Sequence, residues 1–448
     1  MRGVKSLLVL VMVLAGLGAY IYFVESKKPQ GEEATLSPKV FTVKTDAIDE
    51  ITVKSASGDK TTLKKVGGAW QITDPVSVPA DEAEVSGIVT SLAAVDIVRT
   101  VDENPGDLKP FGLAAPRVDI TFKSAGSAPP QELLIGDKTA TSGDLYAKLP
   151  SQNKVFLIAG SFDASFNRGT FDLRQKAVLA FDRDKVDRLS VQSTPGTAVE
   201  LSRASGEWKI DKPYQAPADY GTVEGLIGRV QSAQMKSIAA QEGGDLKTYG
   251  LDTPAVSVTL GLGSSQATLL FGKTAEPGTV YAKDAARPMV FTVDASLVED
   301  VKKPADDLRR KDVFEFRAFN ATAIQITRGT DTLAFEKATA QGKNAGEKWR
   351  ETKPAAKDVD PAAFDTFLTK LANQRAQSFV AAGQKTKTGL DSPVMVVVVR
   401  FDDGRKEERV SFGRAGADVY AAIAGQPGAA KVDTAEFEDA VKALDSVK

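Results

Sequence analysis

The chain offers a narrow choice of reactive side chains. Its 448 residues include neither a cysteine nor a histidine. That composition removes thiol nucleophiles, histidine-based catalytic triads, ordinary zinc sites and haem ligation by either residue. Any chemistry must therefore use carboxylates, lysine, serine or tyrosine. The lack of cysteine also removes disulfides, which is compatible with either side of a bacterial inner membrane.

The densest group of acids is Asp182, Asp184 and Asp187, three carboxylates within six residues. A calcium loop is the sharpest interpretation of this spacing. However, Arg183 and Lys185 stand between the acids and would repel a cation, and neither the glycine nor the terminal glutamate of an EF-hand completes the pattern. We therefore interpret the stretch as a solvated linker and expect no metal ligands.

No other pattern singles out a catalytic or cofactor site. Gly261-Leu262-Gly263 is a fragment of a dinucleotide-binding loop, but it precedes a strand rather than a helix, so a hairpin turn is the better interpretation. No pair among the 59 acids is marked by its spacing for glycoside hydrolysis. We expect no catalytic residues, no cofactor and no cofactor-binding residues, and the sequence leaves the binding residues unknown.

The overall charge excludes one class of partner. Lys and Arg total 57 against 59 Asp and Glu, a formal net charge of -2. Such a chain lacks the basic footprint that binds the phosphate backbone, so we do not expect a nucleic-acid partner.

Two clusters of cations occupy matching positions. Arg174 and Lys176 lie in one Leu-Arg-x-Lys stretch, and Arg309 and Lys311 lie in another, each followed by a phenylalanine and a strand at the same spacings. A domain junction accommodates ion pairs, and a helix C-terminus accommodates positive charge, which favours a structural role. The functional alternative is contact with an anionic partner.

The elements that would position these side chains recur three times. Gly112, Gly250 and Gly389 are 138 and 139 residues apart, and each begins a Gly-Leu-x-x-Pro stretch followed by alternating apolar residues. Alternation predicts a strand with one buried face. Glycine permits a left-handed turn, leucine enters the core, and proline opens a strand where its missing N–H does no harm. A later strand of each copy ends at a glycine, namely Gly136, Gly272 and Gly413.

The first half of each copy has its own pattern. A strand containing Trp70, Trp208 or Trp349 comes first, and a helix pattern follows it. The apolar positions of the three helix patterns advance in steps of three and four, as one buried helix face requires. They are Val85, Ile88, Val89 and Leu92, then Val223, Leu226, Ile227 and Val230, then Phe364, Phe367, Leu368 and Leu371. We predict an α+β fold: three tandem repeats of a mainly antiparallel sheet of about six strands, each with covering helices.

One N-terminal transmembrane helix is expected before the repeats. Residues 6–24 are 19 residues without a charge, which at about 1.5 Å per residue spans most of a roughly 30 Å hydrocarbon core. A cleaved signal peptide is the alternative, but Leu17 stands where a small residue is wanted. The predicted order is a cytoplasmic basic start at 1–5, the anchor at 6–24, a flexible tether at 25–39, and repeat domains at 40–176, 177–311 and 312–448.

The third copy departs from the other two in one strand. Val394, Val396 and Val398 add apolar residues to the second face of a strand that already alternates Met395, Val397 and Val399. Continuous apolar runs favour burial on both faces. The alternative is an exposed apolar patch for a partner.

The ordered set of motifs resembles the bacterial family "domain of unknown function 4340". The resemblance covers residues 40–448 and rests on the N-terminal hydrophobic segment, the tryptophan strand, the Gly-Leu-x-x-Pro turn, the strand ending in glycine and the Leu-Arg-x-Lys junction. The third copy lacks the aromatic residue before Gly389 and the lysine after Tyr420-Ala421. The resemblance implies a membrane-anchored extracytoplasmic protein, often encoded beside ABC-type permease components like those of gliding motility, and it implies no catalytic residues.

From these features we expect a non-enzymatic accessory or scaffold protein of the bacterial inner membrane, with a single membrane span and the bulk of the chain in the periplasm. Its expected partners are the membrane and an ABC-type permease complex. An envelope glycan or lipid binding module is the alternative. A hydrolase that uses carboxylates is the third possibility, for which the discriminating feature is a pocket with converging acids.

Overall fold

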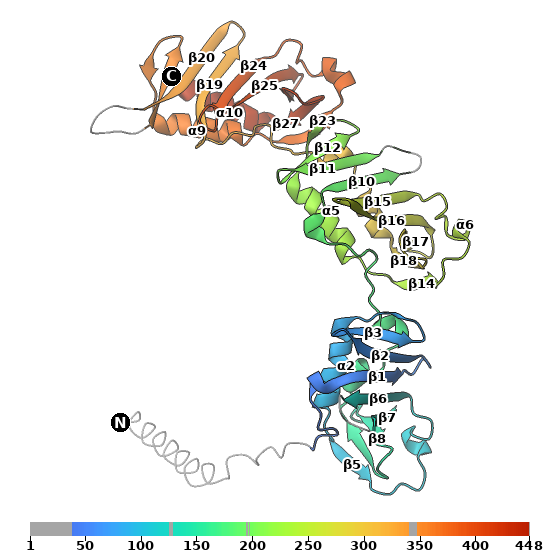
Figure 1. The fold of residues 1–448 in the computed structure, drawn as a ribbon. Helices are drawn as coiled ribbons and strands as arrows, with labels where there is room; N and C mark the ends of the chain where they lie inside the picture. Colours follow the sequence, from blue (N-terminus) through green and yellow to red (C-terminus); the bar gives the residue numbers. More distant parts are fainter. Residues whose placement is uncertain (1–37, 125–128, 194–195, 197, 340–346, 448) are drawn as a thin grey trace, which may run out of the picture. The chain divides into compact units, whose positions relative to one another are not determined.

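The computed structural model describes residues 38–447, apart from 125–128, 194–195, 197 and 340–346 (Figure 1). One compact unit ends at Lys176, and a second runs from Ala177 to Lys448. The first unit contains one antiparallel sheet and the second contains two. The predicted start and anchor, and most of the predicted tether, lie outside the described residues. Within the described ranges, no helix is long and apolar enough to cross a membrane.

The first sheet has the strand order β4-β3-β2-β1-β6-β7-β8-β9-β5. Its strands are β1 (Ile48–Lys54), β2 (Lys60–Val66), β3 (Ala69–Asp74), β4 (Val78–Pro79), β5 (Arg99–Asp102), β6 (Val118–Ser124), β7 (Gln131–Lys138), β8 (Leu145–Lys148) and β9 (Val155–Ile158). The helical elements of this unit are η2 (Thr45–Ala47), α2 (Glu82–Ala94), η3 (Lys109–Phe111), α3 (Phe162–Phe166) and α4 (Thr170–Leu173).

The second sheet repeats the arrangement as β13-β12-β11-β10-β15-β16-β17-β18-β14. Its strands are β10 (Arg188–Ser193), β11 (Val199–Ala204), β12 (Glu207–Lys212), β13 (Ala216–Pro217), β14 (Ser237–Ala240), β15 (Val256–Leu262), β16 (Ser265–Thr274), β17 (Thr279–Asp284) and β18 (Val290–Asp294). With it belong η4 (Arg183–Lys185), α5 (Tyr220–Ser232), α6 (Leu246–Tyr249), α7 (Ala295–Val301) and α8 (Ala305–Leu308).

The third sheet follows the same order, β22-β21-β20-β19-β24-β25-β26-β27-β23. Its strands are β19 (Ala321–Arg328), β20 (Asp331–Thr339), β21 (Glu347–Lys353), β22 (Lys357–Asp358), β23 (Ala376–Val380), β24 (Met395–Phe401), β25 (Lys406–Ala415), β26 (Asp418–Ile423) and β27 (Ala429–Val432). Its helical elements are α9 (Pro361–Ala372), η5 (Ala382–Lys387) and α10 (Thr434–Ser446).

Each sheet therefore has nine strands, whereas the sequence predicted about six. Two of the additional strands in each sheet are its edge strands. One edge strand of each sheet is only two residues long, and the other has four or five residues. Such short segments contain too few residues to show alternation, and two-residue strands are recognisable only from their pairing. The α+β class and the antiparallel sheets are confirmed.

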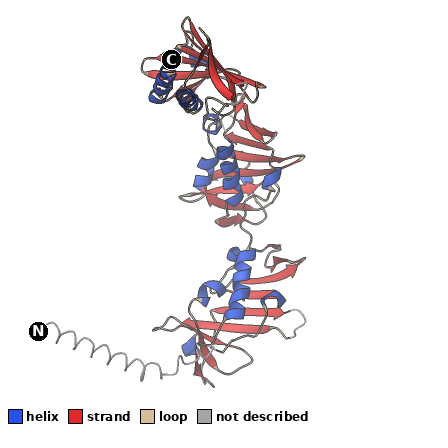
Figure 2. Ribbon diagram, turned by 90° about the vertical axis from the view of Figure 1, so that its left-hand side faces the viewer, coloured by secondary structure: helices blue, strands red, loops and turns tan. Residues whose placement is uncertain are grey.

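The predicted helices are confirmed, and each begins after an aspartate. The Oδ1 atoms of Asp81, Asp219 and Asp360 accept backbone N–H groups of the first turns of α2, α5 and α9 at 2.8–3.2 Å. An N-cap of this kind stabilises a helix by roughly 1 kcal/mol. The helices lie against one face of each sheet (Figure 2). The predicted apolar residues of all three helices are buried.

The Gly-Leu-x-x-Pro turns also have the predicted geometry. Gly112, Gly250 and Gly389 adopt φ values of +69°, +67° and +69°, in the left-handed region that favours glycine. The strand that follows each turn pairs with the first strand of its sheet, as β1–β6, β10–β15 and β19–β24. This central pairing joins the two halves of each repeat.

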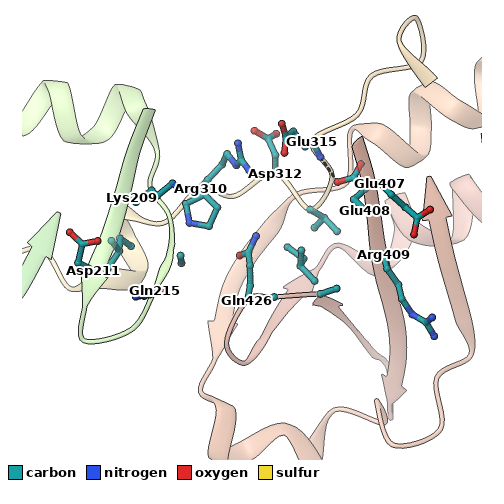
Figure 3. A pocket seen from close by; sticks show the side chains of 17 residues that line it. Lys209, Asp211, Gln215, Arg310, Asp312, Glu315, Glu407, Glu408, Arg409 and Gln426 are labelled. Carbon is teal, nitrogen blue, oxygen red and sulfur yellow. Dashed lines mark hydrogen bonds between the residues drawn. The ribbon is translucent and has the colours of Figure 1, made fainter. Parts of the chain in front are cut away.

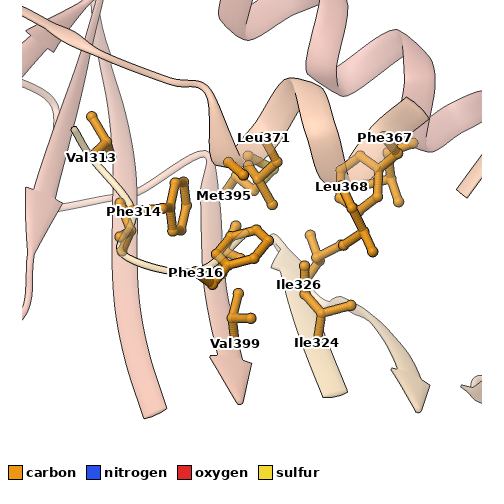
Figure 4. Close-up of a cluster of buried hydrophobic side chains, with 14 of the residues drawn as sticks. Val313, Phe314, Phe316, Ile324, Ile326, Phe367, Leu368, Leu371, Met395 and Val399 are labelled. Atoms are coloured by element: carbon orange, nitrogen blue, oxygen red, sulfur yellow. The ribbon is translucent and has the colours of Figure 1, made fainter. Parts of the chain in front are cut away.

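The third core is closed partly by chain that enters from the second sheet. Val313, Phe314 and Phe316 lie between the sheet and α9 and are at most 2% exposed (Figure 4). The rings of Phe314 and Phe316 pack edge to face at 5.3 Å between centroids. Burying three large apolar side chains anchors the incoming segment by several kcal/mol, at about 1.5–3 kcal/mol each.

Strand β24 differs from its prediction. Its inner face buries Met395, Val397 and Val399, but Val396 and Val398 on the other face are only partly buried. Val394 is 42% exposed. The expectation of burial on both faces is wrong, because the helices of this repeat cover only the inner face.

Candidate functional site

The connection between the second and third sheets leaves almost no free chain. The N–H of Arg310 donates to the carbonyl of Pro217, on the second sheet, at 2.9 Å. The carbonyl of the next residue, Lys311, accepts the N–H of Ala376, on the third sheet, at 2.7 Å. Since consecutive residues are bonded to different sheets, the connection is a taut extended segment rather than a flexible linker.

A groove of about 750 Å³ opens beside this connection (Figure 3). It is formed by β12 and β13 of the second sheet, by the connection itself, and by β25 and the β26–β27 hairpin loop of the third sheet. Its charged lining residues are Lys209, Asp211, Arg310, Asp312, Glu315, Glu407, Glu408 and Arg409. Concave sites with several convergent polar groups are the usual places for binding, so we take this groove as the candidate site.

Glu408 is a partly buried acid of the groove, and it holds the connection in place. Its Oε2 accepts the N–H of Glu315 at 2.8 Å, and its Oε1 accepts the N–H of Phe316 at 2.9 Å. Burial raises the pKa of Glu408, and the nearby charge of Glu315 adds to this effect, while the two backbone donors oppose it. The net result is a raised pKa.

Three other acids of the groove also have partners. Glu315 pairs with Lys406 at 2.5 Å, Glu407 with Arg400 at 2.8 Å, and Asp312 with Arg317 at 3.9 Å. The groove therefore contains converging acids, but these carboxylates already stabilise the connection and β25. As it stands, the site offers charged groups of both signs to a polar ligand or to a protein segment.

The structure buries the two arginines predicted at the junctions but not the two lysines. Arg174 and Arg309 are buried, with 4% and 3% exposure. Lys176 Nζ donates to the carbonyl of Asp172 at 2.8 Å, and Lys311 is exposed. Burial of both arginines favours the structural interpretation of this motif.

The acidic stretch at 182–187 contains η4. The Oδ1 of Asp182 accepts the N–H of Asp184 at 3.2 Å, and its Oδ2 pairs with Lys185 at 3.1 Å. Asp187 pairs with Arg188 at 3.4 Å. In the part of the chain that the structure describes, no group of three or more acids is arranged to hold a metal ion.

Gly261-Leu262-Gly263 lies at a hairpin turn, as expected. Leu262 pairs with Ser265 at the end of the β15–β16 ladder, and Gly263 in the turn has a φ of +67°. The dinucleotide-loop interpretation is wrong, because a strand and not a helix follows.

Sequence reasoning did not single out Glu408, Gln426 or the rest of the groove. Its walls come from residues about 100 and 200 positions apart, and no local motif marks them. The sequence feature that could have indicated the groove is the lysine that is absent after Tyr420-Ala421. In the second sheet that position is Lys283, whose Nζ donates to the carbonyls of Asp284 and Arg287 in the hairpin loop. The third loop lacks this bond and lines the groove instead.

Comparisons with known proteins add a family but no activity. No curated protein matches the chain. Among solved structures, the DnaN sliding clamp (DNA polymerase III subunit beta) from Pseudomonas aeruginosa bound to griselimycin aligns at 9% identity over 88% of this chain and 92% of that chain. Its TM-score is 0.15, so the likeness carries no argument.

The family model for "Domain of unknown function (DUF4340)" matches residues 70–209 and 208–393. The first match begins at Trp70 and the second at Trp208, so each starts at the tryptophan strand of a repeat. The matched segments cover well over half of the chain and confirm the resemblance found from the motifs. The chain therefore belongs to the family "domain of unknown function 4340".

Proposed function

We propose that the chain is a membrane-anchored extracytoplasmic accessory or scaffold protein that works with an ABC-type transport complex and has no catalytic role. In this proposal residues 6–24 span the bacterial inner membrane once, residues 25–39 tether the repeats, and repeat domains at 40–176, 177–311 and 312–448 lie in the periplasm. The groove of the second unit and the neighbouring surface of the third sheet would contact the partner.

The observation that carries the proposal is that the same nine-stranded sheet occurs three times while the side chains on its surface differ from copy to copy. Glu408 lies opposite Val399, and the equivalent positions of the first and second sheets hold Gln131 and Ala267. Thus the position of Glu408 holds no acid in the other two copies. Repeated sheets with differing surfaces suit a protein that offers several contact areas.

The test is a crosslinked purification of the full chain from gently solubilised membranes of the native bacterium. The proposal expects permease and ATPase subunits of an ABC-type complex to be enriched with the chain. The matched control replaces residues 6–24 by a cleavable signal peptide, which should release the repeats into the soluble periplasmic fraction. Recovery of the full chain alone, after efficient crosslinking, would remove the main support for the proposal.

A second candidate function is binding of an envelope glycan or lipid. It is favoured by a groove of about 450 Å³ on the outer face of the second sheet, lined by the hydroxyls of Ser190, Thr259, Ser264 and Ser265, the amide of Gln266 and the acids Glu200 and Asp211. Hydroxyl, amide and carboxylate groups are suitable partners for sugar hydroxyls. Titration with peptidoglycan fragments and with lipid vesicles distinguishes this candidate, since an accessory protein without glycan affinity would show no saturable binding to either.

A hydrolase that uses carboxylates is the least supported of the three. Four of the five acids that line the groove beside the connection, Asp312, Glu315, Glu407 and Glu408, are bonded to the connection or to neighbouring cations. Hydrolysis of envelope glycans by the purified chain would favour this function over the other two.

A further inference from the structure

We propose that Arg309 is a clasp that locks the second and third sheets of the second unit in one orientation and thereby fixes the shape of the groove. This clasp is a conformational device, separate from the proposed function. One buried side chain contacts both sheets, and the connecting segment is hydrogen-bonded to both.

The guanidinium of Arg309 contacts elements of both sheets. Its Cζ lies 4.1 Å from the ring centroid of Phe379, on β23 of the third sheet, and 5.7 Å from that of Tyr214, in the turn before β13 of the second sheet. Its Nη2 donates to Oε1 of Gln426, in the β26–β27 loop, at 2.8 Å. A single side chain thus joins one segment of the second sheet to two segments of the third.

The backbone hydrogen bonds alone would leave one sheet free to rotate relative to the other. Hydrogen bonds at Arg310 and Lys311 fix the connection to both sheets and prevent their separation. A single extended segment, however, still permits rotation about its own axis, because four backbone dihedrals, the φ and ψ of Arg310 and of Lys311, lie between the bonded groups. The side chain of Arg309 is bonded off this axis, so rotation would break its contacts with Phe379 and Gln426.

The buried guanidinium of Arg309 is better suited to specify one arrangement of the two sheets than to stabilise the fold. Arg309 is 3% exposed, and its Nε has no hydrogen-bond partner among the described residues. Burial lowers its pKa, while the hydroxyl of Tyr214 and the charge of Asp306 oppose that effect. A buried cation held by two rings and one neutral amide is costly compared with an apolar side chain, and such groups can be retained because they specify one arrangement.

In the second sheet, the loop equivalent to the one that contains Gln426 also binds the segment that enters the sheet. In the β17–β18 loop, Nη2 of Arg287 donates to the carbonyls of Ala177 and Val178 at 3.1 and 2.5 Å. In the third sheet the equivalent loop presents Gln426, and the arginine comes from the incoming segment. The loop is thus used twice as the attachment point of the preceding segment, with donor and acceptor exchanged.

The experiment measures the distance between the two sheets directly. Because the chain contains no cysteine, Ser264→Cys and Thr330→Cys place two unique spin labels in exposed turns of the second and third sheets of the full chain. Pulsed electron–electron double resonance should give one narrow distance distribution for the labelled parent. Arg309→Met should replace it by a broad one, whereas Lys311→Met, in the same connection but exposed, should leave it narrow.

A narrow and unchanged distribution in folded Arg309→Met would overturn the clasp. If that variant fails to fold, as judged by circular dichroism, Phe379→Leu decides the question. It removes the ring that stacks on the guanidinium from a half-buried edge position, so the fold should persist. Broadening in Phe379→Leu supports the clasp, and the parent distribution in that variant contradicts it.

Discussion

Three glycines near strand ends explain why two sequence motifs recur together. The strands do not stop at Gly136, Gly272 and Gly413 as predicted, because β7, β16 and β25 each continue for two more residues. A Cβ on Gly136 would lie 2.0 Å from the carbonyl oxygen of Phe111, and one on Gly272 would lie 2.1 Å from that of Tyr249. The third copy repeats the contact between Gly413 and Thr388, at 2.5 Å. Each strand-end glycine therefore makes room for the backbone just before a Gly-Leu-x-x-Pro turn. The two motifs are the two halves of one packing contact.

Gly272→Ala should consequently destabilise the second unit. The blocking atom is backbone, which cannot move aside as a flexible side chain can, so we expect a loss of about 1–3 kcal/mol or more in the free energy of unfolding. The measurement is urea denaturation followed by tryptophan fluorescence. Gly225→Ala is the matched control, since Gly225 lies in α5 with no atom within 4 Å of an added Cβ. That change should stabilise the helix, by up to about 1 kcal/mol. Equal effects of the two substitutions would contradict the packing explanation.

Glu408 predicts a pH dependence of stability. Because burial raises its pKa above the ordinary value of 4.5, the folded state holds this proton more tightly than the unfolded state. The resulting stabilisation is fully present below pH 4.5 and is lost as the pH rises through the folded pKa. Glu408→Gln should remove this part of the slope, measured as the difference from the parent in unfolding free energy across a pH series. A parental slope in Glu408→Gln would rule out this group as its source.

At the scale of elements, β24 shows how one strand can differ while the fold is kept. Its outward residues Val396 and Val398 occupy positions held by Ser257 and Thr259 in β15 and by Asp119 and Thr121 in β6. The inward residues are apolar in all three strands. The outer face is therefore free to vary, and only the third copy makes it apolar.

Matched substitutions on the two faces of β24 test this description. Val397 is fully buried, so Val397→Thr places a hydroxyl in an apolar core and should cost about 1–3 kcal/mol. Val396→Thr, one residue away on the partly exposed face, should change the unfolding free energy by less than about 0.5 kcal/mol. Denaturation of the two variants in parallel provides the comparison. A large loss in Val396→Thr would mean that the outer face is covered after all.

The elements that the sequence predicted are those with a strong local period or a required backbone geometry. The helix faces at Val85–Leu92 and its equivalents, and the turns at Gly112, Gly250 and Gly389, are of this kind. The two-residue edge strands have no period to detect. The groove could not be predicted from local patterns. Glu408 acquires its role only when Glu315 and Phe316 are packed against β25, and Gln426 only when it meets Arg309, more than 100 positions earlier in the chain.

At the scale of the whole molecule, the two compact units predict two folding units. Each has its own sheet cores, and Lys176 is the last residue of the first. The three tryptophans are divided between them, with Trp70 in the first unit and Trp208 and Trp349 in the second. With Trp208 and Trp349 replaced by phenylalanine, fluorescence reports on the first unit alone.

Independent unfolding of the two units can then be tested with one destabilising change. Gly136→Ala forces a Cβ against the carbonyl of Phe111 in the first unit, and should lower the transition reported by Trp70 by several degrees. The transition reported by Trp208 and Trp349, in a Trp70→Phe background, should not move, because the second unit has its own two sheets. Fragments 38–176 and 177–448 should likewise each unfold cooperatively. A shift of both transitions by Gly136→Ala, or an unfolded 177–448 fragment, would show instead that the units fold as one, and the second unit could then not be treated as a separate body that carries its own groove and clasp.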